Sequence, residues 1–570
     1  MAWPYRLVDL TEAQKHQRRI FLDRYGLYAQ LSALVPVLGY LLFRLGAWVL
    51  RERRRAQVQY DAIPSSPRLK HARLASTESL AKRWRTAAWW LDEELVEGWG
   101  LRKHWIIGGI WMSWLLFLCV HQTGDDYLHI TKRFGEVAAS QLPFHYMLSM
   151  KSLYSPLALV FKTSHEELNP YHRLSGRVIY SMLCLHATWY LNYFVQANVL
   201  SKRLSAPVVI IGIIAFTSLT VIATSSLAVV RRWNYRVFFV LHLVIGVAVL
   251  PLLFFHASHM RIYLFEALTL FIVDIVCRKL DTTTGFATIT PVPQTKLIKM
   301  KILLPSSKLK RFHEAPGQHV YLSIPPESTP PSTVSPSIHD LLFNPFTVAE
   351  VSAKDVTLVL RTLHGPTTQA IETLSHLSKA KPPVYIEGPL GSSRHFPNLA
   401  ANFDRILLVA GGVGATFILP IYKSLLDQFE TESKSPDRIT LVWSMRSASE
   451  ASWAVDPSAR IKIDDDQNVK IFVTRRSGDD RSNDGESSAS NGIELEEIGN
   501  GEELVKASGG RERPDLKKFV DETFRHGNEE RVAVLVCGPE GMAKEVKKQV
   551  GRWVVEKGRD VWFHDESFGW

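Results

Sequence analysis

Two stretches of equal length decide how this chain folds: HRLSGRVIYSMLCLH at 172–186 and HLVIGVAVLPLLFFH at 242–256. Each stretch begins and ends with a histidine, so both histidine pairs have the same separation of 14 residues. In an α-helix, a segment of this length rises about 21 Å and returns to within about 40° of its starting direction. Each helix would therefore present two imidazoles on one face, near opposite sides of a membrane.

Two such helices that run parallel would bring the four imidazoles together as two facing pairs. A facing pair can bind a haem iron from both sides. The alternative for any single histidine is a packed, hydrogen-bonded residue without a ligand. Four ionisable groups inside hydrocarbon are costly, and the duplicated spacing favours a function. We therefore predict two haems whose axial ligands are His172 with His242, and His186 with His256.

The apolar residues lie mainly before position 280, which indicates a membrane domain followed by a soluble one. Windows of about 20 apolar residues predict about seven spans: 27–50, 104–122, 137–160, 174–196, 207–230, 237–256 and 261–278. One span separates the two histidine-bearing spans, so these two run in the same direction. The span at 137–160 is the weakest because His145, Lys151 and Pro156 interrupt it.

Basic clusters set the expected orientation. By the positive-inside rule, the arginines and lysines at 51–55, 102–103, 231–232 and 278–279 mark cytosolic ends, although 132–133 and 202–203 fall on the other side. The amino terminus is then outside, and the carboxy-terminal half is in the cytosol. The opening residues lack the features of a signal peptide, so we expect the first span to be retained as an anchor.

The composition excludes several classes of protein. The segment 51–103 carries a net charge of +5, out of +11 for the whole chain. In it, Trp84, Trp89 and Trp90 accompany an amphipathic stretch. We expect this segment to contact anionic lipid of the bilayer, not nucleic acid. The four cysteines at 119, 184, 277 and 537 form no CxxC pair, which argues against a disulfide framework and a zinc site.

The second half of the chain changes its pattern twice. From about 285, short alternating strands predict an antiparallel β-barrel. From about 404, apolar strands alternate with helical stretches, which is typical of a nucleotide-binding α/β sheet. The predicted domains are 1–100 (first span and basic loop), 101–280 (haem domain), 281–398 (barrel) and 399–570 (α/β domain), with a disordered insert at 476–513.

A glycine-rich turn in the α/β region predicts a nucleotide site. A strand runs directly into Gly411-Gly412-Val413-Gly414-Ala415-Thr416, and a helical stretch follows. Glycines let the backbone approach a pyrophosphate, and the helix amino terminus offers free N–H groups. The segment Cys537-Gly538-Pro539 ends a later strand, at the edge where such sheets bind ligands. The alternatives are an ordinary turn and, for Cys537, a buried small hydrophobe.

The chain resembles the ferric reductase and NADPH oxidase family, and most closely its short fungal metalloreductases. The motifs that carry this resemblance are NPYHRLSGRVIYSMLCLH, RRWNYRVFFVLHLV, PGQHVYL, NPFTVAEV, EGPLG, AGGVGATFILP and CGPEGM. The resemblance implies a multi-span haem domain joined to a ferredoxin-reductase-like module with FAD and NADPH domains. It implies electron transfer from cytosolic NADPH to FAD, through two b-type haems, to an acceptor across the membrane.

The resemblance also implies cofactor-binding residues. The family's usual flavin motif begins with histidine, whereas this chain has Asn344, which keeps a hydrogen-bonding tip without a titratable charge. FAD would contact Gln318, His319, Asn344, Pro345, Phe346, Thr347, Arg361, Gly365, Thr367, Thr368 and a terminal aromatic residue, Phe568 or Trp570. NADPH would contact Gly411, Gly412, Gly414, Ala415, Thr416, Cys537, Gly538 and Pro539, with Arg446 or the pair Thr474 and Arg475 at the 2′-phosphate.

Three functions remain open at this point. The first is a reductase of ferric or cupric complexes, and the second is an oxidase that makes superoxide from oxygen. Oxidases of the family commonly carry a histidine where this chain has Tyr190, which favours metal. The third is a non-enzymatic membrane relative, for which Asn344 is the main support. Outer loop residues could attract a metal chelate or simply be solvated: Asp125, Asp126, His129 and His259. The plasma membrane is the expected location, the endoplasmic reticulum also fits the topology, and the oligomeric state stays open.

Overall fold

The computed structural model describes residues 5–58, 67–325, 328, 343–363, 365–376, 381–455, 463, 466–474, 512–527 and 529–566. The predicted insert at 476–513 therefore lies almost entirely outside the described residues. The described residues form two compact units. The first contains 5–58, 67–79 and 90–281, and the second contains 80–89 and the residues from 282 onward.

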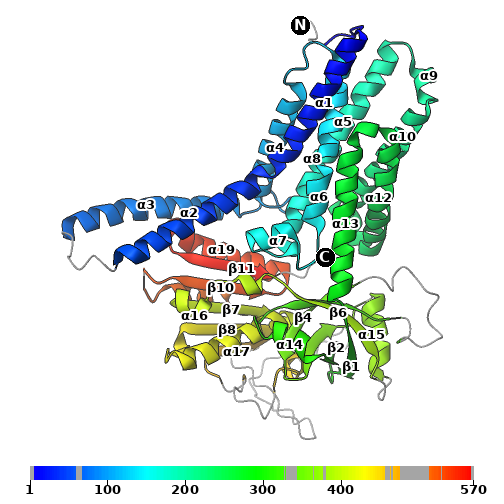
Figure 1. Ribbon diagram of the computed structural model, residues 1–570. Helices are drawn as coiled ribbons and strands as arrows, with labels where there is room; N and C mark the ends of the chain where they lie inside the picture. The colour runs from blue at the N-terminus through cyan, green and yellow to red at the C-terminus, as the bar shows by residue number, and fades with distance from the viewer. Residues whose placement is uncertain are drawn as a thin grey trace, which may run out of the picture. The chain divides into compact units, whose positions relative to one another are not determined.

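The first unit is helical (Figure 1). Its helices are α1 (Glu12–Ala33), α2 (Val35–Val58), α3 (Pro67–Leu91, shared with the second unit), α4 (Arg102–Val120), α5 (Tyr127–Ser140), α6 (Leu142–Ser149), α7 (Pro156–Phe161), α8 (His165–Gln196), α9 (Leu200–Leu204), α10 (Pro207–Ser225), α11 (Ala228–Trp233), α12 (Tyr235–His256), η1 (Ser258–Met260) and α13 (Arg261–Asp281).

Helices α5 and α8 form the centre of this unit. Nearly every residue of α5 is buried, and its side chains pack against α1 and α8. The Asp126 side chain caps α5 by accepting hydrogen bonds from the backbone N–H groups of Leu128 and His129. Helix α8 begins with the Ser164 cap and two glutamates in its first turn, which favours a helix start there. Helix α10 contacts both α8 and α12.

The membrane spans agree with the sequence only in part. Among the described residues, four helical segments are long and apolar enough to cross a membrane: Glu12–Leu50, Arg102–Val120, Pro207–Ser225 and Tyr235–His256. The predicted span at 137–160 is not one helix, because α5, α6 and α7 divide it. Prolines begin the second and third pieces, since a proline N–H is not needed in a first helical turn. The count of seven spans stays a prediction.

The second unit begins with a closed antiparallel barrel, as the alternating pattern predicted. Its strand order is β1-β2-β5-β4-β3-β6. The strands are β1 (Thr283–Pro291), β2 (Leu297–Leu303), β3 (His319–Ser323), β4 (Asn344–Val351), β5 (Asp355–Arg361) and β6 (Pro383–Leu390), with helices α14 (Ser306–Phe312) and α15 (Pro366–His376). Inward-facing aliphatic side chains fill the barrel, including Met300, Val320 and Leu358.

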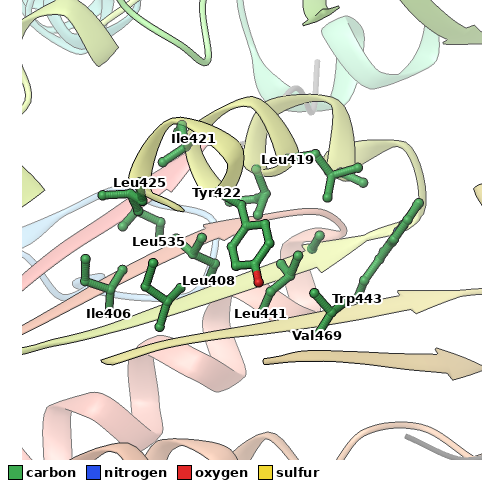
Figure 2. Packing of buried hydrophobic residues seen from close by; sticks show 14 of the residues in the cluster. Ile406, Leu408, Leu419, Ile421, Tyr422, Leu425, Leu441, Trp443, Val469 and Leu535 are labelled. Carbon is green, nitrogen blue, oxygen red and sulfur yellow. The ribbon is translucent and has the colours of Figure 1, made fainter. Parts of the chain in front are cut away.

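A five-stranded parallel sheet follows, with the order β11-β10-β7-β8-β9. Its elements are β7 (Arg405–Gly411), β8 (Ile439–Met445), β9 (Val469–Val473), β10 (Val532–Cys537), β11 (Val561–Glu566), α16 (Leu399–Asn402), α17 (Ala415–Thr431), α18 (Leu516–Phe524) and α19 (Glu540–Lys557). Figure 2 shows α17 packing its apolar face on the sheet, with the Tyr422 ring directed at the strands. The Tyr422 hydroxyl donates to Asp466 Oδ2 over 2.5 Å, which satisfies this buried polar group.

Residues 80–89 of α3 also pack on this α/β sheet domain. The Trp89 ring is edge-on to Phe563 of β11, with ring centroids 5.8 Å apart, and it occupies the space beside Gly551 of α19. Arg85 donates to the Gly558 carbonyl over 3.0 Å. Trp89 therefore contacts protein, whereas Trp84 is exposed, and the lipid contact expected for this segment stays a prediction.

Candidate functional site

The rings of His172 and His242 face each other in the first unit. Their centroids lie 6.1 Å apart, and the ring planes make an angle of 67°. His172 Nδ1 lies 3.2 Å from the backbone oxygen of His145. His242 Nδ1 lies 3.3 Å from Ser226 Oγ, whose own hydrogen goes to a backbone carbonyl. Both Nδ1 atoms must therefore be donors.

The rings of the second pair, His186 and His256, are also held by hydrogen bonds from Nδ1. His186 Nδ1 lies 2.9 Å from the Thr131 carbonyl on α5, and His256 Nδ1 lies 2.8 Å from the Val208 carbonyl on α10. Glycines make room for both rings. A Cβ on Gly135 would lie 2.7 Å from the His186 ring, and one on Gly212 would lie 2.5 Å from the His256 ring.

All four histidines thus donate from Nδ1 to an oxygen. In a neutral imidazole this leaves the lone pair on Nε2, which is the tautomer that binds a metal. Metal-binding histidines usually have such a hydrogen bond from the other ring nitrogen, because it fixes the ring orientation. The common pattern makes the four residues a matched set and not isolated packed histidines.

A haem iron fits the pair His172 and His242. Two imidazoles on opposite sides of one metal, with metal–nitrogen bonds of about 2.0–2.1 Å, have ring centres about 6 Å apart, and the observed separation is 6.1 Å. Within the described ranges, no group of three or more His, Cys, Asp or Glu side chains is placed to hold a metal ion. A haem needs only two axial side chains, so the donor set suits it.

The predicted flavin residues cluster on neighbouring barrel strands. Strand β4 carries the motif from Asn344 to Thr347, and it pairs with β3 so that His319 lies opposite Thr347. Asn344 Nδ2 donates to Thr367 Oγ1 over 2.7 Å, which ties β4 to the start of α15. Gln318 is buried, and among the described residues neither polar atom of its side-chain amide has a hydrogen-bond partner. Such an orphaned buried amide fits a pocket that receives a polar ligand.

The loop predicted to hold flavin phosphates has an internal hydrogen-bond network. Thr368 Oγ1 donates to the Leu363 and Gly365 carbonyls. Arg361, at the end of β5, donates to Glu450 Oε1 over 2.8 Å. The same guanidinium nitrogen lies 3.7 Å from the position of a Cβ on Gly412. The predicted flavin-phosphate arginine and the predicted dinucleotide turn therefore meet at one place.

Two glycine turns meet at the carboxyl edge of the parallel sheet. Strand β7 pairs with β10, so that Ala410 lies opposite Cys537. A Cβ on Gly414 would lie 2.1 Å from the Cys537 carbonyl oxygen, which only glycine avoids. Gly412 has φ +53° and its carbonyl accepts from Trp443 Nε1 over 3.1 Å. Because the strand order reverses between β7 and β10, this is where such sheets bind nucleotides.

The remaining predicted dinucleotide residues differ in their surroundings. Burial, together with the nearby Glu566 carboxylate, raises the pKa of the Cys537 thiol well above its ordinary value. Thr416 is buried and its hydroxyl donates to the Val413 carbonyl, so it shapes the turn. Arg446 is exposed just after β8, and Thr474 follows β9 with its hydroxyl donating to Met445. The other predicted positions, Arg475, Phe568 and Trp570, lie outside the described residues.

The outer loop candidates are engaged in the protein itself. Asp126 forms an ion pair with Arg18 at 2.9 Å in addition to its capping role. His129 Nε2 lies 2.9 Å from an Arg133 nitrogen. His259 lies 2.9 Å from Glu136, which is buried. These partners favour the structural alternative for Asp126, His129 and His259 over a free metal-attracting surface.

Several residues that shape these sites could not be predicted from the sequence. Ser226 accepts a hydrogen bond from His242, and Gly135 and Gly212 make room for the rings of His186 and His256. Trp443 and Glu450 flank the glycine turn at 411–414. None of these residues has a periodic or motif signal. Their roles depend on which helix or strand lies next to them.

These features indicate a class: a membrane oxidoreductase whose helical unit carries paired histidines and whose second unit contains an antiparallel barrel and a parallel α/β sheet. Comparison with known proteins agrees. Residues 134–253 match the family "Ferric reductase like transmembrane component", and residues 403–551 match "Ferric reductase NAD binding domain". The chain is thus an integral membrane protein with an NAD-binding domain, and its resemblance to ferric reductases is confirmed.

Individual relatives are distant. The chain is 25% identical over 537 residues to the probable metalloreductase AIM14 of Meyerozyma guilliermondii, covering 92% of this chain and 96% of that protein. It is 26% identical over 361 residues to ferric reductase transmembrane component 1 of Schizosaccharomyces pombe, covering 56% of this chain and 60% of that protein. A solved structure, the ferredoxin reductase in carbazole 1,9a-dioxygenase, aligns with a TM-score of 0.31 and 15% identity, over 50% of this chain and 69% of that one.

Proposed function

We propose that this protein transfers electrons from cytosolic NADPH, through FAD and two b-type haems, to ferric or cupric complexes on the opposite side of the plasma membrane. The observation that carries the proposal is the matched hydrogen bonding of His172, His186, His242 and His256, each through Nδ1. The relatives named as ferric reductases and metalloreductases support a metal acceptor.

In this proposal, the four paired histidines of the first unit bind the two haems. The four histidines would hold two haem irons, each from both sides, which would leave no coordination site on the metal for an acceptor. An acceptor would then receive its electron without binding to the iron. Two centres are needed because a bilayer has about 30 Å of hydrocarbon. An inside-negative membrane potential assists the outward movement of an electron, by about 2.3 kcal/mol per 100 mV for complete transfer.

The residues of the second unit bind and orient the two nucleotides. FAD, when bound, accepts a hydride from NADPH and releases the electrons one at a time, which haems require. Gln318 offers a buried amide to the flavin, and Asn344 fixes Thr367 beside it. The backbone N–H groups at Gly412 and Gly414, together with the amino terminus of α17, suit the dinucleotide pyrophosphate. The buried Cys537 excludes water from the carboxyl end of β10.

The test is consumption of NADPH by purified, haem-loaded full-length protein supplied with FAD. Anaerobic reduction of a ferric chelate is compared with superoxide formation in air without chelate. Fast anaerobic formation of Fe(II) with little superoxide supports the metalloreductase. Superoxide that matches NADPH consumption would replace it with the oxidase. A protein without haem absorption and without NADPH consumption would be the non-enzymatic relative.

A further inference from the structure

A fifth histidine lies against the pair His172 and His242. The ring of His145, on α6, stacks on the ring of His172 with centroids 4.1 Å apart and ring planes 17° apart. The backbone oxygen of the same residue accepts the hydrogen bond from His172 Nδ1. His145 therefore contacts His172 through both its main chain and its side chain. The proposed electron path assigns it no role.

A short hydrogen-bond chain fixes the His145 ring. Its Nδ1 lies 2.6 Å from Ser175 Oγ, and the Ser175 hydroxyl donates to the His172 carbonyl over 3.2 Å. Because the serine hydrogen is used there, His145 Nδ1 must be the donor to Ser175. Gly176 leaves room for the ring, since a Cβ at that position would lie 3.1 Å from His145 Cε1. The ring thus has little freedom to rotate.

The stacking geometry restricts one motion in particular. A metal bound to Nε2 of an imidazole lies in the plane of that ring, so the ring of an axial histidine can still rotate about the metal–nitrogen bond. A second ring stacked in parallel blocks this rotation, because any turn of His172 would drive its face into His145. The hydrogen bond from His172 Nδ1 to the His145 carbonyl also restricts rotation of the His172 ring.

We propose that His145 is a positioning residue for the inner haem, which it orients by fixing the rotation of the His172 ring relative to that of His242. This inference rests on the proposed function, because it requires haem at the inner pair. The angle between two axial imidazole planes determines the electron paramagnetic resonance (EPR) signature of a low-spin ferric haem and contributes to its reduction potential. A purely structural residue in α6 would alter neither quantity.

The experiment compares the purified full-length wild-type protein with His145→Leu, His145→Phe and Ser175→Ala. The measurements are haem content by the pyridine haemochrome method, low-temperature EPR of the ferric protein, and a redox titration of each haem. Ser181→Ala is the matched control, because Ser181 lies on the same helix, is exposed, and bonds only to the Arg177 carbonyl.

We expect His145→Leu to retain both haems while the largest g value and the midpoint potential of one haem shift. His145→Phe, which keeps a flat ring, should shift them less, and Ser175→Ala should shift them in the same direction as the leucine variant. Ser181→Ala should match the wild type. Unchanged spectra and potentials in both the leucine and the serine variants would overturn the inference. Loss of one haem in His145→Leu, equal to the loss in His172→Ala, would make His145 a binding residue instead. Wild-type protein without haem would refute the proposed function itself.

Discussion

The imidazole rings of His172 and His242 lie 6.1 Å apart, centroid to centroid, although α9, α10 and α11 separate their helices in the chain. This separation matches that of two ligands on one iron. Each Nδ1 is already committed to an oxygen, so little reorganisation is needed before a metal binds Nε2. The pair is therefore preorganised, and changes around it should affect haem directly.

Removal of an outer histidine should remove one haem. We expect His256→Ala to reduce the haem content from two groups per chain to one and to abolish reduction of an external ferric chelate, because the single remaining ring cannot hold the iron from both sides. Absorption spectroscopy and the pyridine haemochrome assay measure the loss. His121→Ala, which changes a histidine bound to Tyr25, should keep both haems. Full chelate reduction by His256→Ala would refute the electron path.

Gly414 should tolerate no side chain. A Cβ there would lie 2.1 Å from the Cys537 carbonyl oxygen, and backbone cannot move aside cheaply. We expect Gly414→Ala to destabilise the α/β domain by about 1–3 kcal/mol or more and to weaken binding to immobilised NADP. Gly541→Ala is the control, since nothing lies within 4 Å of its Cβ position. Equal melting temperatures for the two variants would contradict this close packing.

The hydrogen bond between Asn344 and Thr367 should support flavin binding. Loss of this 2.7 Å bond in Asn344→Ala should cost about 1 kcal/mol, which corresponds to an approximately fivefold weaker affinity for FAD. Fluorescence of released flavin measures the change. Thr367→Val should have the same effect, and the double variant should add little. Thr373→Val, on the same helix with a bond only to the Gln369 carbonyl, should leave the affinity unchanged.

The raised pKa of Cys537 should make stability depend on alkaline pH. The folded state holds the thiol proton more tightly than the unfolded chain, whose cysteines ionise near pH 8.5. The contribution to the unfolding free energy is therefore fully present below about pH 8.5 and falls as the pH rises above it. Thermal unfolding between pH 7 and 10 measures this slope, and Cys537→Ala should reduce it. Identical slopes for the two proteins would show that the thiol is not responsible.

Much of this protein follows from local sequence patterns. The equal spacing of the four histidines depends only on the period of an α-helix, and the alternation after position 285 depends only on the period of a strand. The glycines at 411, 412 and 414 mark a turn: a Cβ on Gly411 or Gly414 would clash with Pro539 or with the Cys537 carbonyl, and Gly412 has φ +53°. These patterns determined the barrel, the parallel sheet, the pairing of His172 with His242, and the membrane class.

The tertiary structure alone decided how these elements support one another. The carbonyls of Thr131 and Val208 bind histidines from 48 to 55 residues away, and a backbone carbonyl has no sequence signature. The break of α5 into α6 placed His145 against His172, and the domain packing brought Arg361 to Glu450. Residue identity and period encode local conformation, whereas contacts between distant segments depend on how whole elements pack. The pattern alone could therefore name the four paired histidines but not the residues that orient them.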